Sequence, residues 1–166
     1  MVNIKRWLTH LFMPPWRLRL AFSSATLKAI ETAVSESERL HRGELRFAVE
    51  NTLPLWQVWQ GISARQRAVE VFAKLGVWDT EENSGVLIYV LLADREVHIV
   101  ADRGINQCVT QLEWNQIAEL MQSTFSSGAF EQGAVEGIQQ ITHLLAEHFP
   151  ALEDNANELS DTPVII

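Results

Sequence analysis

The chain has 166 residues, close to the length of one ordinary domain, and no apolar run reaches the roughly 18 residues of a membrane-spanning helix. Its formal charge of −8 is uneven, because residues 1–42 carry seven bases and three acids whereas residues 104–166 carry nine acids and neither Lys nor Arg. The acidic part argues against nucleic acid as a partner, since phosphate binding needs clustered cations, and it permits divalent cations. The single cysteine excludes an intrachain disulfide and fits a cytoplasmic protein.

Residues 1–22 form a basic and aromatic leader with four Lys or Arg residues and no acid. A positive start before an apolar run resembles a signal peptide, but Pro14-Pro15 interrupts the run and a small-residue cleavage site is missing. Three alternatives stay open for this leader: its apolar residues dock on the domain, it contacts an anionic membrane surface or a partner protein peripherally, or it is a cleaved or anchoring signal.

The next elements are a helix, a strand and a second helix. Ser23 or Ser24 can cap a helix that ends at Gly43, and residues 44–50 alternate as a strand with one strongly apolar face. Residues 51–61 form an apolar connector whose two tryptophans are expected to pack as a lid on the core. A capping box, Ser followed three residues later by Gln, then starts the second helix.

The second half predicts a hairpin and two long helices inside one domain, residues 23–150. The expected strands and helices cover residues 86–92, 96–101, 110–128 and 130–148. Gly133 and Gly137 inside the last helix predict close helix packing. Residues 151–166 are polar and acidic, and we expect a flexible tail.

The predicted order α-β-α-β-β-α-α indicates an α/β fold with a small mixed sheet covered by helices. A strand–helix–strand unit places its strands parallel. The start of the first strand, the start of the central strand and the end of the last hairpin strand should therefore share one end of the sheet.

Three polar stretches meet at that end. Their candidate residues are Glu38, His41 and Glu44, then Asp79, Glu81, Glu82 and Asn83, and finally Asp102 and Arg103. Carboxylate and amide oxygens suit Ca²⁺ or Mg²⁺, and a cation with Arg103 beside it can hold a phosphate group. Simpler alternatives are solvated loop charges, a helix C-terminal role for His41, and Asp102 as a cap or as a partner of Arg103.

The run A-R-Q-R-A-V-E-V-F-A-K-L-G-V-W-D-T-E-E-N-S-G-V-L-I-Y-V-L-L-A-D-R-E-V-H-I-V-A-D-R-G-I resembles the TPM domain (TPM_phosphatase) family, in its short soluble bacterial form. The upstream E-R-L-H-R-G-E-L-R-F-A-V-E and the downstream W-N-Q-I-A-E-L-M are also similar, so the resemblance covers about residues 24–150. It implies a three-layer α/β/α sandwich with an acidic cleft at one sheet end, which some members use for Ca²⁺ or Mg²⁺. Some members are described as acid phosphatases and others lack that activity. Asn83-Ser84-Gly85 stands where the family usually shows Asn-Asn-Gly.

Together these features predict a TPM-like accessory module with a divalent-cation cleft, acting through an unknown protein partner. The expected cation ligands are Glu44, Asp79, Asn83 and Asp102, with Glu38 and His41 in support. The alternative is a weak metal-dependent acid phosphatase, for which Asp79, Asp102 and Arg103 are the catalytic candidates. A third reading is a structural or membrane-peripheral protein that uses residues 1–22.

Overall fold

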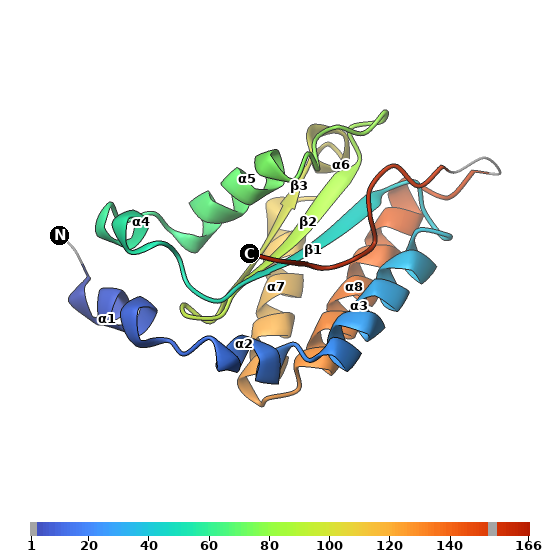
Figure 1. Ribbon diagram of the computed structural model, residues 1–166. Helices are drawn as coiled ribbons and strands as arrows, with labels where there is room; N and C mark the ends of the chain where they lie inside the picture. The colour runs from blue at the N-terminus through green and yellow to red at the C-terminus, as the bar shows by residue number, and fades with distance from the viewer. Residues whose placement is uncertain (1–2, 153–155) are drawn as a thin grey trace.

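A computed structural model describes residues 3–152 and 156–166, which form a mixed sheet covered by helices on both faces (Figure 1). The strands are β1 (Glu44–Glu50), β2 (Gly85–Leu91), β3 (Glu96–Ala101) and β4 (Val164–Ile165). Their order is β3-β2-β1-β4, with β1 parallel to both β2 and β4 and with β2 antiparallel to β3. The predicted α/β fold and its small mixed sheet are confirmed.

Helices form the two outer layers of a three-layer sandwich. They are α1 (Ile4–Phe12), α2 (Trp16–Ala21), α3 (Ser24–Ser37), α4 (Leu55–Trp59), α5 (Ala64–Lys74), α6 (Arg103–Asn106), α7 (Gln111–Ser126) and α8 (Phe130–His148). One apolar core joins α2, α3, α7 and α8 to one sheet face, and a second core joins α4 and α5 to the other. The predicted element order is present, and α1, α2, α4, α6 and β4 are added to it.

Local sequence signals explain the elements that frame the sheet. Capping boxes start α5 at Ser63 and α7 at Thr110, as predicted. Every residue of β2 is buried, because helices cover both faces of this central strand. A Cβ atom on Gly137 would lie 2.4 Å from the Met121 sulfur, and one on Gly133 would lie 2.8 Å from the Phe125 ring, so both glycines allow α8 to approach α7 closely.

Two local predictions are wrong. Helix α3 ends at Ser37 rather than at Gly43, and Leu40, which lies beyond its end, is exposed. The chain leaves the helix there and turns, and the Arg42 N–H, five residues further on, donates to the Phe149 carbonyl at 2.8 Å and so ties this segment to a distant part of the chain. The tryptophans of the connector do not form a lid: Trp56 and Trp59 are 60% and 65% exposed, because α4 turns its other side inward.

The leader docks on the domain through both apolar and polar side chains. Leu18 and Phe22 lie in the core on one sheet face, and Trp7 packs against the core on the other. Arg6 forms an ion pair with Asp94 at 2.8 Å, and His10 Nε2 lies 3.0 Å from the same carboxylate. The Leu53 N–H donates to His10 Nδ1 at 2.9 Å, and α1 packs against α4. In the part of the chain that the structure describes, no helix is long and apolar enough to cross a membrane.

The C-terminal segment, residues 156–166, lies along β1 at the edge of the sheet (Figure 1). Val164 and Ile165 pair with Ala48 and Val49, and the Ile166 N–H donates to the Val49 carbonyl at 2.9 Å. The flexibility expected for residues 151–166 stays a prediction, and its residues 153–155 lie outside those described. The placement nevertheless differs from that of a solvated tail, because the apolar end of the chain adds a strand.

Candidate functional site

Strand pairing brings the three polar stretches to one end of the sheet. Glu44 pairs with Gly85 across the parallel β1–β2 ladder, and the Glu44 N–H donates to the Ser84 carbonyl at 3.1 Å. The Asp102 N–H donates to the Gly85 carbonyl at 2.8 Å, directly after β3. The backbone convergence predicted from the crossover rule is therefore present.

Asn83, Asp102 and Arg103 form the part of this end that we call the junction cluster. Arg103 Nε donates to Asn83 Oδ1 at 3.0 Å, and Asp102 Oδ1 caps α6 by accepting the Arg103 N–H at 2.7 Å. Asn83 has a φ of 53°, and its carbonyl accepts the Gly104 N–H at 3.0 Å. A Cβ atom at residue 104 would lie 2.6 Å from the Glu82 and Asn83 carbonyl oxygens, so only glycine permits this approach.

The second carboxylate oxygen of Asp102 marks this cluster as unusual. Asp102 Oδ2 is buried, and no hydrogen-bond donor reaches it from the residues that the structure describes. A buried acceptor without a donor costs free energy, which a bound cation or a donated hydrogen bond would recover. The capping alternative for Asp102 is thus observed for one oxygen and leaves the other available.

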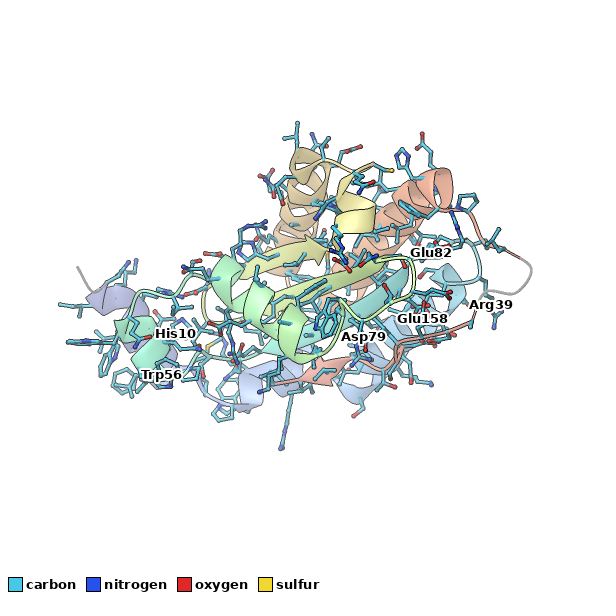
Figure 2. The ribbon with its side chains drawn as sticks, turned by 90° about the horizontal axis from the view of Figure 1, so that it is seen from above. His10, Arg39, Trp56, Asp79, Glu82 and Glu158 are labelled. Carbon is cyan, nitrogen blue, oxygen red and sulfur yellow. The ribbon has the colours of Figure 1, made fainter. Side chains whose placement is uncertain are left out.

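The loop between α5 and β2 carries the remaining acidic candidates. The Asp79 side chain is exposed, while its N–H closes a turn onto the Gly76 carbonyl at 3.0 Å. Glu82 pairs with Arg42 at 2.7 Å, and the Glu81 N–H donates to Glu158 at 3.0 Å. Figure 2 shows Asp79, Glu82 and Glu158 on the same side of the molecule.

Glu38, His41 and Glu44 form a separate, buried group. Glu38 Oε1 accepts the Leu45 N–H at 3.0 Å, and Glu44 Oε2 accepts the Leu159 N–H at 3.0 Å. All three side chains are buried, and the C-terminal segment lies over Glu44. The structure therefore separates these residues from the exposed loop that holds Asp79.

Burial shifts the protonation of this buried group. It raises the pKa of Glu38 to about 8, and repulsion from Glu44 and Asp161 acts in the same direction. Burial also raises the pKa of Glu44, although the hydrogen bonds that its carboxylate accepts from backbone N–H groups oppose the rise. Burial lowers the pKa of His41 to about 4, so its imidazole is neutral near pH 7.

A preassembled cluster of metal-ligand side chains is not found among residues 3–152 and 156–166, since no three His, Cys, Asp or Glu side chains gather closely enough to hold an ion. The ligand set predicted from the sequence, Glu44, Asp79, Asn83 and Asp102, stays a prediction. The oxygens that come together at the junction cluster are instead a single carboxylate, one amide oxygen and backbone carbonyls.

Sequence reasoning missed residues that hold this end together. Ser84 donates its N–H to Thr80 Oγ1 at 2.9 Å and its hydroxyl to the Arg42 carbonyl at 3.3 Å, so it ties the loop to the start of β1. The role of Gly104 was readable from the glycine directly after Asp102-Arg103. The position of Leu159 over Glu44 was harder to predict, because its one indication in the sequence is the apolar run that ends the chain.

These features define a class: a small α/β/α sandwich with a polar, partly open junction where its parallel strands begin. The TPM domain (TPM_phosphatase) family model matches residues 20–144, and the chain belongs to this family. The NMR structure of BA42 protein from the psychrophilic bacterium Bizionia argentinensis is 33% identical, covers 87% of this chain and 94% of that one, and has a TM-score of 0.77. The solution structure of the N-terminal domain of a P. gingivalis protein is 18% identical, covers 76% and 78%, and shares the fold with a TM-score of 0.61. No curated protein matches the chain.

Proposed function

We propose that this TPM domain is an accessory module that binds Ca²⁺ or Mg²⁺ at the junction cluster and acts through a protein partner. The observation that carries the proposal is Asp102 Oδ2, a buried carboxylate oxygen that receives no hydrogen bond from the described part of the chain. Carboxylate, amide and carbonyl oxygens are the ligands that both cations take.

The residues present fit such an ion at the surface. Asp102 supplies a charged ligand, and Asn83 supplies an amide oxygen once Arg103 releases it. Asp79, exposed on the neighbouring loop, is the second carboxylate in the proposal. A surface ion held by few protein groups keeps positions open, and a carboxylate of a partner protein can fill one of them. Glu38, His41 and Glu44 are buried beside β1 and are not ligands in this proposal.

Thermal unfolding with and without cation tests the site. At a concentration of Ca²⁺ or Mg²⁺ about ten times the Kd, binding stabilises the folded state by about 1.4 kcal/mol, or a Tm rise of about 3–5 °C. Asp102→Asn keeps the cap oxygen, removes the charge and should abolish the rise. Glu119→Gln, an exposed change on α7, is the matched control and should keep it.

Two results would overturn the cation site. One is a Tm that does not move at millimolar cation. The other is a rise of equal size in Asp102→Asn, which would place the ion elsewhere on this acidic chain.

A second function, weak phosphomonoester hydrolysis, is favoured by the exposed guanidinium of Arg103 directly beside Asp102. Arg103 would hold the phosphate, and Asp79 or Asp102 would act as nucleophile or base. The test is hydrolysis of p-nitrophenyl phosphate from acidic to neutral pH, in the presence of Mg²⁺ or Ca²⁺. Loss of activity in both Asp102→Asn and Arg103→Met supports it, and equal rates in the variants and the parent identify a contaminant.

A further inference from the structure

The leader helix α1 is amphipathic, and it faces the domain with the side that a surface helix usually gives to water. Arg6 and His10, four residues apart, bind Asp94 and the Leu53 backbone, and the His10 side chain is fully buried. A helix that packs on a core normally turns its apolar stripe inward. Here polar contacts, together with the half-buried Trp7 that packs against the core, fix the helix, and its other apolar side chains are left on the outer side.

The outer side of α1 is a continuous apolar stripe. Ile4, Leu8, Leu11 and Phe12 follow helical spacing on one face, and each is at least 41% exposed, with Ile4 and Phe12 at 70% and 73%. Because α1 is held through its opposite face, the stripe is presented to the surroundings in a fixed orientation.

Neighbouring helices add large apolar side chains at the same end of the molecule. Helix α4, which packs against α1, contributes the exposed Trp56 and Trp59, and α2 contributes Trp16 and Leu20. Figure 2 shows Trp56 beside His10, at the end opposite Arg39. We call this set of exposed apolar residues on α1, α2 and α4 the leader surface. Its tryptophans are of the type that concentrates where a membrane meets water.

Charge indicates what the leader surface contacts. Residues 1–22 contain four Lys or Arg residues and no acid, whereas the rest of the chain is strongly acidic. Arg6 is paired with Asp94, and Lys5, Arg17 and Arg19 are exposed. Cations beside exposed aliphatic and indole side chains complement a surface that is anionic outside and apolar beneath.

A cavity lies next to this surface and is lined by the same kinds of side chain, apolar residues and arginines. Its volume is about 460 Å³, and its lining includes Met13, Arg17 and Leu20 from the leader together with Arg95, Phe125 and Phe130 from the domain. The lining is therefore mainly apolar and includes two arginines and one acidic residue, Glu96, and part of an amphiphile can enter the cavity.

We propose that the leader surface binds an anionic lipid membrane, with α1 lying in the interface and its polar face bound to the domain. This inference is independent of the cation site, which lies at the other end of the sheet.

Vesicle flotation of the full chain tests the proposal. Vesicles of phosphatidylcholine alone are compared with vesicles that contain about 30% phosphatidylglycerol. We expect at least about tenfold stronger partitioning to the anionic vesicles, and weaker binding as salt rises. The paired variants Leu8→Gln with Phe12→Gln, and Lys5→Glu with Arg17→Glu, should each lower the partition coefficient at least about tenfold.

Matched controls change the same chemistry elsewhere. Leu112→Gln alters an equally exposed leucine on α7, and Arg39→Glu reverses an exposed charge at the opposite end; both should bind as the parent does. A parent that ignores anionic vesicles overturns the proposal. Controls that lose binding as fully as the leader variants overturn it as well. A parent dimer that dissociates in Leu8→Gln with Phe12→Gln would show that a second copy covers the surface instead, which also overturns it.

Discussion

The buried carboxylates at the two ends of the sheet have different hydrogen-bond partners. At the end near the leader, Glu50 accepts two hydrogen bonds from Arg67, at 2.9 and 3.0 Å, and one from the Tyr89 hydroxyl at 2.6 Å. Asp94 at the same end is bound by Arg6 and His10. At the other end, Glu38, Glu44 and Asp102 each accept a backbone N–H.

Protonation follows this division. Burial acts to raise the pKa of Asp94, but the hydrogen bonds from His10 and Arg6 outweigh it and lower the pKa to about 2. Burial raises the pKa of Glu38 to about 8. A carboxylate matched to a cation stabilises the fold in its charged form, whereas burial without a matched cation disfavours the charged form even where a backbone N–H group donates to it. The carboxylates at the leader end are therefore paired with cationic side chains, whereas Glu38, Glu44 and Asp102 at the junction end accept backbone N–H groups.

The largest expected effect tests the leader end. Arg67→Met leaves Glu50 buried without its guanidinium, so we expect a loss of about 3–5 kcal/mol in the free energy of unfolding, measured with urea at pH 7. Arg65→Met, on the exposed side of the same helix, should change it by less than about 0.5 kcal/mol. Similar losses in the two variants would mean that the Glu50 ion pair is not a major support.

The next effect concerns acid sensitivity. Because the pKa of Asp94 is lowered in the folded state, its stabilisation is present above about pH 4 and is lost as the pH falls towards 2. Asp94→Asn should therefore lower the free energy of unfolding by about 2 kcal/mol at pH 7 and hardly at pH 2. Urea unfolding at both pH values measures the difference, and a loss that is independent of pH would contradict the ion-pair explanation.

For Glu38 we expect the opposite dependence of the free energy of unfolding on pH. Its raised pKa means that stability is fully present below about pH 4.5 and is lost as the pH rises towards 8. Glu38→Gln should thus be more stable than the parent by at least about 1 kcal/mol at pH 8 and equal to it at pH 4.5. Melting curves of both proteins at pH 4.5 and pH 8 measure this. A variant that is less stable at pH 8 would show that the charged form supports the fold.

The sequence predicted those features correctly whose signals lie within a few neighbouring residues. The capping boxes at Ser63 and Thr110 and the buried run of β2 lie within a few residues, and they gave the right elements. The convergence at the junction end followed from a general rule of strand connection. These signals gave the order of the seven predicted elements, and five short ones, α1, α2, α4, α6 and β4, were missed.

The details of the site depend on contacts between distant parts of the chain. Glu44 is covered by Leu159, 115 residues further on, and the segment between α3 and β1 is tied to Phe149 through the Arg42 N–H. Periodicity within one segment cannot contain such contacts. The exposure of Trp56 likewise follows from the packing of α4, which buries Gln57 and Val58 on its other side.

The most direct test of the contrast between the two ends is an NMR titration of the labelled chain with Ca²⁺ and with Mg²⁺. Binding at the junction cluster should shift the amide signals of residues 82–85 and 102–104, leave those of Glu50, Arg67 and Asp94 in place, and be lost in Asp102→Asn. Unmoved signals at millimolar cation, or shifts that survive Asp102→Asn, would contradict the proposed site.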